Sequence, residues 1–202
     1  MKIALVGSRW FGAQMLHLLV EKGHAVRVIG LTEDDHLTKA ARESGVPLLL
    51  LGRPRRVTGE DIGEDIDVIL AAHAHSFVTA EARERARLAA IGYHPSLLPR
   101  HRGIAAVEWT IRCRNPIAGG SVYHLSESLD GGAIAAQDWC FVYPDDDAGT
   151  LWRRALAPMG LRLLMKVVDD IDRRGFADAM PQDAKAVTLA KSHDRATMLA
   201  ST

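Results

Sequence analysis

The sequence predicts an α/β domain with a mostly parallel, twisted sheet and helices on both of its faces. Short apolar runs alternate with amphipathic segments over the first hundred residues. Each stretch between two runs is long enough to hold a crossover helix, which parallel strands require. The runs are apolar at nearly every position, as strands buried on both faces are.

Four apolar runs in the first half predict buried strands, at 1–7, 25–30, 46–51 and 67–72. Helices are expected between or after these strands, at 11–22, 38–44 and 79–88. In the first helix, Phe11, Met15 and Leu18 fall at helical spacing, and Gly23 supplies a stop signal.

The second half follows a different pattern. Two strand-like runs, 120–125 and 133–142, are separated by a polar, glycine-rich connector at 126–132. Acidic residues at 145–147 precede a long apolar-periodic segment, 151–171, which predicts a helix because acidic side chains favour helix starts.

These elements predict a single domain over residues 1–202. Its parts are an α/β core to about residue 115, a strand-loop-strand with a long helix over about 116–175, and a tail, 176–202. The tail has weak periodicity, and we expect one short edge strand near 186–190.

Composition narrows the class of protein. Equal numbers of basic and acidic residues, 25 each, give zero formal net charge, so no basic field favours nucleic acid or an anionic membrane. Two cysteines, Cys113 and Cys140, suit a reducing compartment. No apolar stretch approaches a membrane span or a signal segment. A cytoplasmic location is therefore expected, whereas the oligomeric state cannot be read from the sequence.

Glycines follow the first apolar run, in the segment from Gly7 to Gly12. Their spacing lacks the G-x-G-x-x-G pattern of dinucleotide-binding loops, because Trp10 and Phe11 stand between them. We expect a tight turn packed by these two aromatic side chains.

Histidines cluster in the middle of the chain. His73 and His75 end the fourth apolar run and would point to one face of an extended segment. A metal site made from these two with His94 or Asp130 is one interpretation, although catalytic zinc normally needs three protein ligands. The favoured interpretation is that they line a pocket at the carboxyl end of the sheet. His101, between two arginines, is expected to be a solvated loop charge.

His94 opens a loop framed by two prolines, Pro95 and Pro99, which cannot lie inside a helix or a central strand. The loop fixes the direction of the His94 imidazole, a group that exchanges protons near neutral pH. His94 is therefore a candidate catalytic residue.

The stretch His94-Pro-Ser-Leu-Leu-Pro99, with Arg102-Gly103 behind it, resembles the signature loop of the folate-dependent formyltransferases. Residues 121–134, SVYHLSESLDGGAI, resemble the strand, loop and catalytic aspartate of the same family. Asp130 then stands at the family's usual separation from His94, and the segment 147–151 resembles the start of the family's long helix. The resemblance implies a Rossmann-like formyltransferase fold.

The resemblance also implies a reaction: an amine attacks the formyl carbon of 10-formyltetrahydrofolate, and a developing oxyanion needs positioned donors. His94 would be the oxyanion donor and proton shuttle, and Asp130 its partner. The family's pterin pocket corresponds here to Ser76, Phe77 and Val78, and to Leu125, Ser126, Glu127, Ser128 and Leu129. No resident metal is implied.

One position departs from the family pattern. The family's asparagine, two residues before the histidine, is Gly92 here. Loss of one oxyanion donor typically lowers the rate by about 10²–10³. His73, His75 and Tyr123 are the candidates to fill the space above Gly92, whereas Tyr93 should point to the opposite face of the strand.

The acceptor is expected to be a small amine, such as an amino sugar or an amino-acid-like molecule, because the chain stops at Thr202 without a domain that would grip tRNA. Two alternatives remain: a hydrolase in which water replaces the amine, and a catalytically impaired relative that binds folate.

Overall fold

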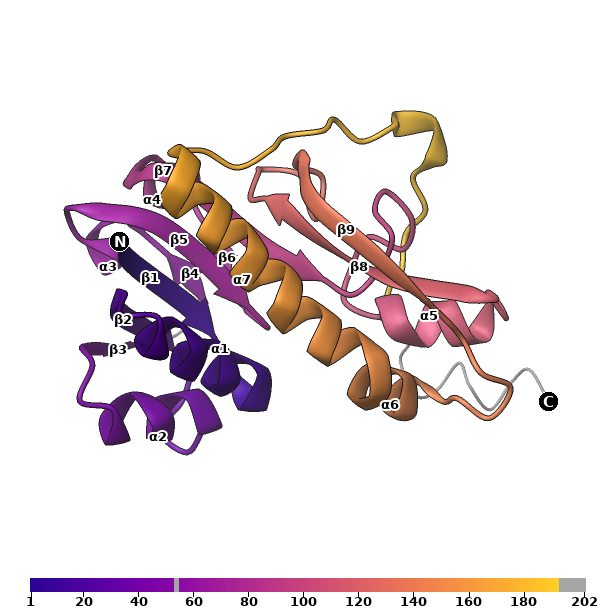
Figure 1. Ribbon diagram of the computed structural model, residues 1–202, viewed down its shortest axis with the longest axis horizontal. Coiled ribbons are helices and arrows are strands. Elements are labelled where there is room, and N and C mark those ends of the chain that lie inside the picture. Colours follow the sequence, from indigo (N-terminus) through magenta and orange to yellow (C-terminus); the bar gives the residue numbers. More distant parts are fainter. Residues whose placement is uncertain (53–54, 193–202) are drawn as a thin grey trace.

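The computed structural model describes residues 1–52 and 55–192 (Figure 1). Its main sheet has seven strands in the order β3-β2-β1-β5-β7-β8-β9. Five are parallel: β1 (Lys2–Gly7), β2 (Ala25–Gly30), β3 (Leu48–Leu50), β5 (Ile66–Ala72) and β7 (Ala86–His94). Two further strands extend the sheet: β8 (Ile117–His124), antiparallel to β7, and β9 (Ile134–Phe141), antiparallel to β8. The predicted α/β class with a mostly parallel sheet is confirmed.

Helices cover both faces of this sheet. The chain forms α1 (Arg9–Glu21), α2 (His36–Glu43), α3 (Gly59–Ile62), α4 (Ala80–Glu84), α5 (Ala106–Arg112), α6 (Ala148–Leu151) and α7 (Ala157–Arg174). A π-helical turn, η1 (Trp152–Leu156), joins α6 to α7, and a 3₁₀ turn, η2 (Ala184–Ala186), lies in the tail. A separate two-stranded pair consists of β4 (Arg56–Val57) and β6 (Phe77–Val78). No helix in the described ranges is long and apolar enough to cross a membrane.

Two apolar cores lie on opposite faces of the sheet. The larger core joins side chains of α1, α2 and α7 to one face, and Phe11, Met15 and Leu164 are buried in it. The smaller core joins α3, α4 and the β4–β6 pair to the other face, through residues such as Ile62 and Ile69. Because successive side chains of a strand point to opposite faces of the sheet, neighbouring residues of β7 face different cores.

Tyr93 joins β7 to the helical layer of the larger core. Its ring occupies the space where a Cβ atom at Gly120 or Gly160 would lie, so both positions need glycine. The phenol donates to the carbonyl oxygen of Leu156 at 2.7 Å, and the ring stacks on Phe11 with centroids 5.6 Å apart. Tyr93 therefore points away from the Gly92 face, as the alternation of an extended strand predicts.

Three local predictions were wrong. The helix expected over 79–88 ends at Glu84, because β7 begins at Ala86 and pairs with β5. The tail forms no strand over 186–190, where Leu189 makes an isolated bridge to Arg102. The glycine turn is packed by Phe11 alone, since Trp10 is 48% exposed on α1. The end of the predicted tail, 193–202, lies outside the described residues.

Candidate active site

His94 is the last residue of β7, and its imidazole is buried. The Nε2 atom lies 2.8 Å from the carbonyl oxygen of His101. Because a carbonyl only accepts hydrogen bonds, Nε2 carries the hydrogen of this contact. The other ring nitrogen, Nδ1, lies 3.5 Å from Oδ2 of Asp130. Nδ1 is therefore the atom that can exchange a proton beside the carboxylate.

Asp130 is buried as well, and both of its carboxylate oxygens accept hydrogen bonds. Oδ2 accepts from the backbone N–H of Gly103 at 2.8 Å, and Oδ1 accepts from the Tyr123 hydroxyl at 2.8 Å. Burial, followed by the nearby carboxylate, raises the pKa of the Tyr123 phenol well above its ordinary value, so this phenol remains a donor. Asp130 has a left-handed backbone, φ 49°, which an aspartate tolerates better than most residues. The structure thus brings the two predicted catalytic residues together.

The proline loop after His94 is fixed to β8 by one buried hydroxyl. Ser121 donates to the carbonyl oxygen of Ser96 at 2.6 Å and accepts from the backbone N–H of Leu98 at 3.1 Å. Gln137 of β9 donates to both Ser121 and the carbonyl of Leu98, each at 2.8 Å. The Leu98–Pro99 peptide is cis. The expectation of a rigid, shaped loop agrees with these contacts.

His101 corrects the expectation of a solvated loop charge. Its side chain is buried, and Nε2 contacts Oδ1 of Asn115 at 2.8 Å. The flanking arginines suggested solvent, but the left-handed backbone at His101, φ 55°, turns the ring inward toward α5 and β8. Its main chain rather than its ring reaches the catalytic pair, through the contact with His94.

Gly92 lies beside an apolar side chain. A Cβ atom at this position would lie 3.0 Å from Cδ2 of Leu125 and 3.3 Å from Cβ of Ala71. Tyr123 is the cross-strand partner of Gly92, but its hydroxyl is committed to Asp130. None of the three proposed substitutes for the family's asparagine is among the nearest atoms to this Cβ position.

His73 and His75 form a second pair, at the end of β5. Their rings meet edge to face with centroids 4.7 Å apart, and His73 also lies against Trp152 at 6.1 Å. The two rings do come together, but through a left-handed turn at His73, φ 56°, rather than an extended segment. Burial first, and His75 second, lower the pKa of His73 to about 4. In the parts of the chain that the structure describes, no group of three or more acidic, histidine or cysteine side chains could hold a metal.

The segments expected to bind the pterin border the smaller core. Val78 is part of that core and Leu125 packs against it, so the two segments approach the same face of the sheet. Phe77 and Leu129 are 43% and 69% exposed, and the buried Ser76 hydroxyl has no partner among the described residues. Ser126, Glu127 and Ser128 lie in the turn that leads to Asp130.

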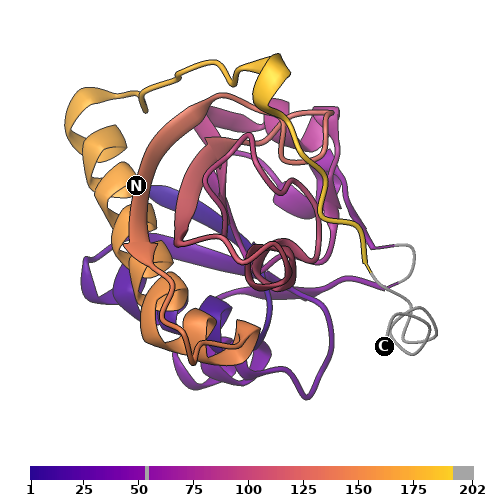
Figure 2. The ribbon, with the colours of Figure 1, turned by 90° about the vertical axis from the view of Figure 1, so that its right-hand side faces the viewer.

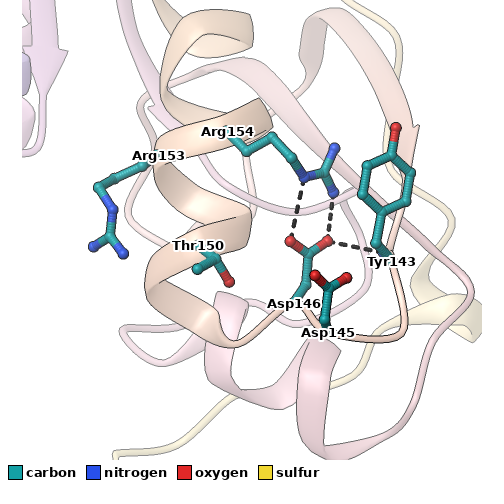
Figure 3. A pocket seen from close by; sticks show the side chains of 6 residues that line it. All are labelled: Tyr143, Asp145, Asp146, Thr150, Arg153 and Arg154. Atoms are coloured by element: carbon teal, nitrogen blue, oxygen red, sulfur yellow. Dashed lines mark hydrogen bonds and ion pairs between the residues drawn. The ribbon is translucent and has the colours of Figure 1, made fainter.

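An open hollow of about 430 Å³ lies elsewhere, at the start of α6 (Figure 3). Asp146 and Arg154 pair across it, while Arg153 points away from the other lining side chains. None of its lining residues belongs to the predicted site, which therefore gains nothing from this hollow.

Comparison with known proteins identifies the family. A family model described as formyl transferase matches residues 53–168. The chain belongs to the formyl transferase family. The resemblance that the sequence motifs suggested is therefore confirmed.

Named relatives of this formyl transferase family member fall into two groups. The cytosolic 10-formyltetrahydrofolate dehydrogenase of Xenopus laevis is 33% identical over 201 residues, which cover 93% of this chain and 22% of the relative. The mitochondrial 10-formyltetrahydrofolate dehydrogenase of Homo sapiens is 32% identical with the same coverage. Methionyl-tRNA formyltransferase of Methylobacillus flagellatus is 27% identical, over 97% of this chain and 68% of the relative. The chain thus spans about a fifth of the length of the dehydrogenases.

Solved structures agree on the fold. A 4-N formyltransferase from Francisella tularensis superposes with a TM-score of 0.79 and 18% identity, over 98% of this chain and 78% of that chain. Glycinamide ribonucleotide transformylase 1 from Symbiobacterium toebii gives 0.77 and 19%, over 89% and 94%. A sugar 3-N-formyltransferase solved with dTDP and 5-N-formyl-tetrahydrofolate gives 0.77 and 16%, over 94% and 69%. At these identities the likeness shows the Rossmann-like formyltransferase fold.

Some residues of the site could not be found from sequence. His101 contacts His94 through its backbone carbonyl, and Gly103 contacts Asp130 through its backbone N–H. Every residue type has a backbone carbonyl and most have an N–H, so the sequence gives no signal for either contact. Tyr123 was a candidate for a different task, because strand register rather than spacing puts it beside Asp130.

Proposed function

We propose that the chain takes the formyl group of 10-formyltetrahydrofolate and transfers it to the amine of a small molecule, with His94 and Asp130 as the catalytic pair. The observation that carries the proposal is the buried contact of these two side chains at the carboxyl edge of the sheet. Ligands of open α/β sheets bind at this edge. The names of the dehydrogenase relatives support the donor, as does the 5-N-formyl-tetrahydrofolate in the sugar enzyme's structure.

In this reaction the amine nitrogen attacks the formyl carbon, and the carbonyl oxygen becomes an oxyanion. The bond from that carbon to N10 of the folate then breaks, and tetrahydrofolate leaves with a proton on N10. Nδ1 of His94 lies 3.5 Å from Oδ2 of Asp130 and, when it carries a proton, is the donor available to the oxyanion, while the Nε2–H stays on the His101 carbonyl. The Asp130 carboxylate beside it can accept the proton that the amine loses and pass it on to N10.

The acceptor belongs to a small-molecule class, an amino sugar or an amino-acid-like amine. Zero net charge gives the chain no general attraction for a nucleic acid.

A second candidate is hydrolysis, in which water takes the place of the amine and formate is released. One observation favours it. The relatives that are 32–33% identical are named for the formyl-folate and not for an amine acceptor. The position of the family's asparagine is crowded by Leu125 and Ala71, so the chain offers fewer side-chain donors to an oxyanion than its family pattern does, which favours instead a catalytically impaired relative that binds folate.

One assay separates the candidates: release of tetrahydrofolate from 10-formyltetrahydrofolate, with and without a panel of amino sugars and amino acids. Release that depends on an amine supports transfer, and release in buffer alone supports hydrolysis. Calorimetric titration with a stable 5-formyl analogue covers the third case, because binding without any release identifies a folate-binding relative. If the chain neither binds the analogue nor releases tetrahydrofolate, the proposal is overturned.

A further inference from the structure

The segment 176–191, here called the strap, leaves α7 and runs back over the β8–β9 hairpin to the loop that follows β7 (Figures 1 and 2). Met180 pairs with Ile134 through two backbone hydrogen bonds, 2.8 and 2.9 Å long. Farther along, Arg102 donates its backbone N–H to the carbonyl of Thr188 at 2.9 Å, and its carbonyl accepts from Ala190 at 2.7 Å. The strap therefore contacts both the start of β9 and the loop that follows His94.

Gln182 makes the most complete contact of the strap. Its Nε2 donates to the carbonyl oxygens of Asp130 and Gly132, at 2.8 and 2.7 Å. Its Oε1 accepts from Nε and from a terminal nitrogen of Arg102, at 3.0 and 2.7 Å. Both hydrogens and both lone pairs of the amide are thus in use. The side chain is half-buried although its sequence neighbours Pro181 and Asp183 are exposed.

Thr188 holds the other side of the site. Its hydroxyl oxygen accepts the backbone N–H of His101 at 2.8 Å. The carbonyl oxygen of His101 in turn accepts a hydrogen bond from Nε2 of His94. The main chain of a single residue, His101, therefore connects the Thr188 hydroxyl to the His94 imidazole.

Arg102 lies in the sequence between His101 and Gly103, whose main chains make hydrogen bonds to the His94–Asp130 pair. On one side the His101 carbonyl holds His94, and on the other the Gly103 N–H holds Asp130. A movement of Arg102 would change both contacts together. Gln182 ties Arg102 to the main chain of Asp130, and so closes a ring of hydrogen bonds around the pair.

We propose that Gln182, supported by Thr188, is a positioning residue that sets the separation and orientation of the His94–Asp130 pair. The proposal rests on the function proposed above. It extends the site into a segment outside residues 53–168, the part that the family model matches. Gln182 touches no reacting atom, and it acts through the two loops that it joins.

The test uses three strap variants of the full chain and one control. Gln182→Met keeps the size of the side chain and removes all four hydrogen bonds. Gln182→Glu keeps the acceptor for Arg102 but turns an oxygen toward the two carbonyls. Thr188→Val removes the acceptor for His101. Lys185→Gln, at an exposed position of the same strap, is the matched control.

Two readouts separate positioning from mere support of the fold. The first is tetrahydrofolate release, where kcat should fall about 10- to 100-fold in both Gln182 variants while KM for the formyl donor stays within about twofold. The second is the pH titration of the His94 ring by NMR, with the signal assigned by its loss in His94→Asn. Its midpoint should move in all three strap variants and stay in place in Lys185→Gln.

Folded Gln182 variants with the wild-type kcat and the wild-type His94 midpoint would overturn the proposal, as would a rise in KM alone. If Gln182→Met does not fold, Gln182→Glu and Thr188→Val decide by the same readouts. Loss of folding in all three, with Lys185→Gln intact, would make the strap a structural support only. A wild-type chain that releases no tetrahydrofolate refutes the proposed function, whereas the NMR titration still decides the role of the strap.

Discussion

The His94–Asp130 and His73–His75 pairs differ in how many of their imidazole nitrogens have a polar partner in the fold. Both lie where neighbouring strands of the sheet end, His94–Asp130 at β7 and His73–His75 at β5. Both nitrogens of His94 face a protein acceptor. Nδ1 of His73 and Nε2 of His75 are buried without a partner among the described residues.

This contrast shows that partners, not residue type, decide what a histidine can do. For His94, Oδ2 of Asp130 lies 3.5 Å from Nδ1, so a carboxylate is within reach of that ring nitrogen. Burial beside a second imidazole instead lowers the pKa of His73 to about 4, so that this ring is neutral at pH 7. The first pair is therefore the one that we propose for proton transfer.

The largest expected effect comes from breaking the first pair. His94→Asn or Asp130→Asn should lower kcat for tetrahydrofolate release by about 10²–10⁴, the usual contribution of a general acid–base group. His73→Gln, the matched change in the second pair, should alter kcat less than threefold, or roughly 0.6 kcal/mol in the barrier. Steady-state assays on folded variants check this, and an equal loss at both positions would contradict the contrast.

A smaller effect, of opposite sign, is expected at Gly92. Gly92→Asn alone should crowd Leu125, whose Cδ2 would lie 3.0 Å from the new Cβ, and should destabilise the fold by about 1–3 kcal/mol. Gly92→Asn with Leu125→Ala makes room for the amide and should raise kcat at least tenfold, part of the 10²–10³ that one oxyanion donor contributes.

Leu125→Ala alone is the control for that gain. If the double variant is no faster than this control, the native site obtains its donors elsewhere and Gly92 is not the defect.

The support of Asp130 gives a third, weaker test. Tyr123→Phe removes one of two hydrogen bonds to the carboxylate, while the Gly103 N–H remains. We expect a loss of about 1.5–3 kcal/mol in unfolding free energy, the range for a hydrogen bond to a charged group. The loss of kcat should be smaller than in Asp130→Asn. Urea unfolding and turnover measured on the same preparation check both values, and a Tyr123→Phe chain as slow as Asp130→Asn would contradict this order.

The smallest effect concerns acid stability and the second pair. The pKa of His73 is lowered from 6.5 to about 4 in the fold, so between these values the unfolded chain binds more protons than the native one. The unfolding free energy should therefore fall as the pH drops from 6.5 toward 4, and this contribution is fully present above 6.5. His73→Gln should flatten that slope in urea titrations at pH 7 and 5. An unchanged slope would mean that His73 does not titrate in this window.

Much of this arrangement could be predicted from the sequence, and the rest has a physical reason for staying hidden. Apolar runs predict β1, β2 and β5 because strands buried on both faces leave a continuous signal. The proline-framed loop marks His94, and the motif around Asp130 marks its partner. The start of β7 was not predicted, because Arg87, which pairs with Asp67 at the surface, continues the charged pattern that predicted a surface helix over 79–88.

The contacts that hold the pair are long-range and partly made by the main chain. Spacing cannot reveal that Gln182 lies against Asp130, since the tail has no periodic pattern to place it. The same is true of Leu125 beside Gly92, which depends on the return of the chain after β8.

Tyr93 fixes how the long helix sits on the sheet. Its ring fills the room left by one glycine on β8 and another on α7, and its hydroxyl is tied to the turn before α7. Such an interlock allows α7 only one axial position, because a slip of one residue would replace Gly160 by a bulkier side chain against the ring. The molecule therefore cannot adjust to a ligand by sliding this helix along its axis unless the Tyr93 ring is displaced first.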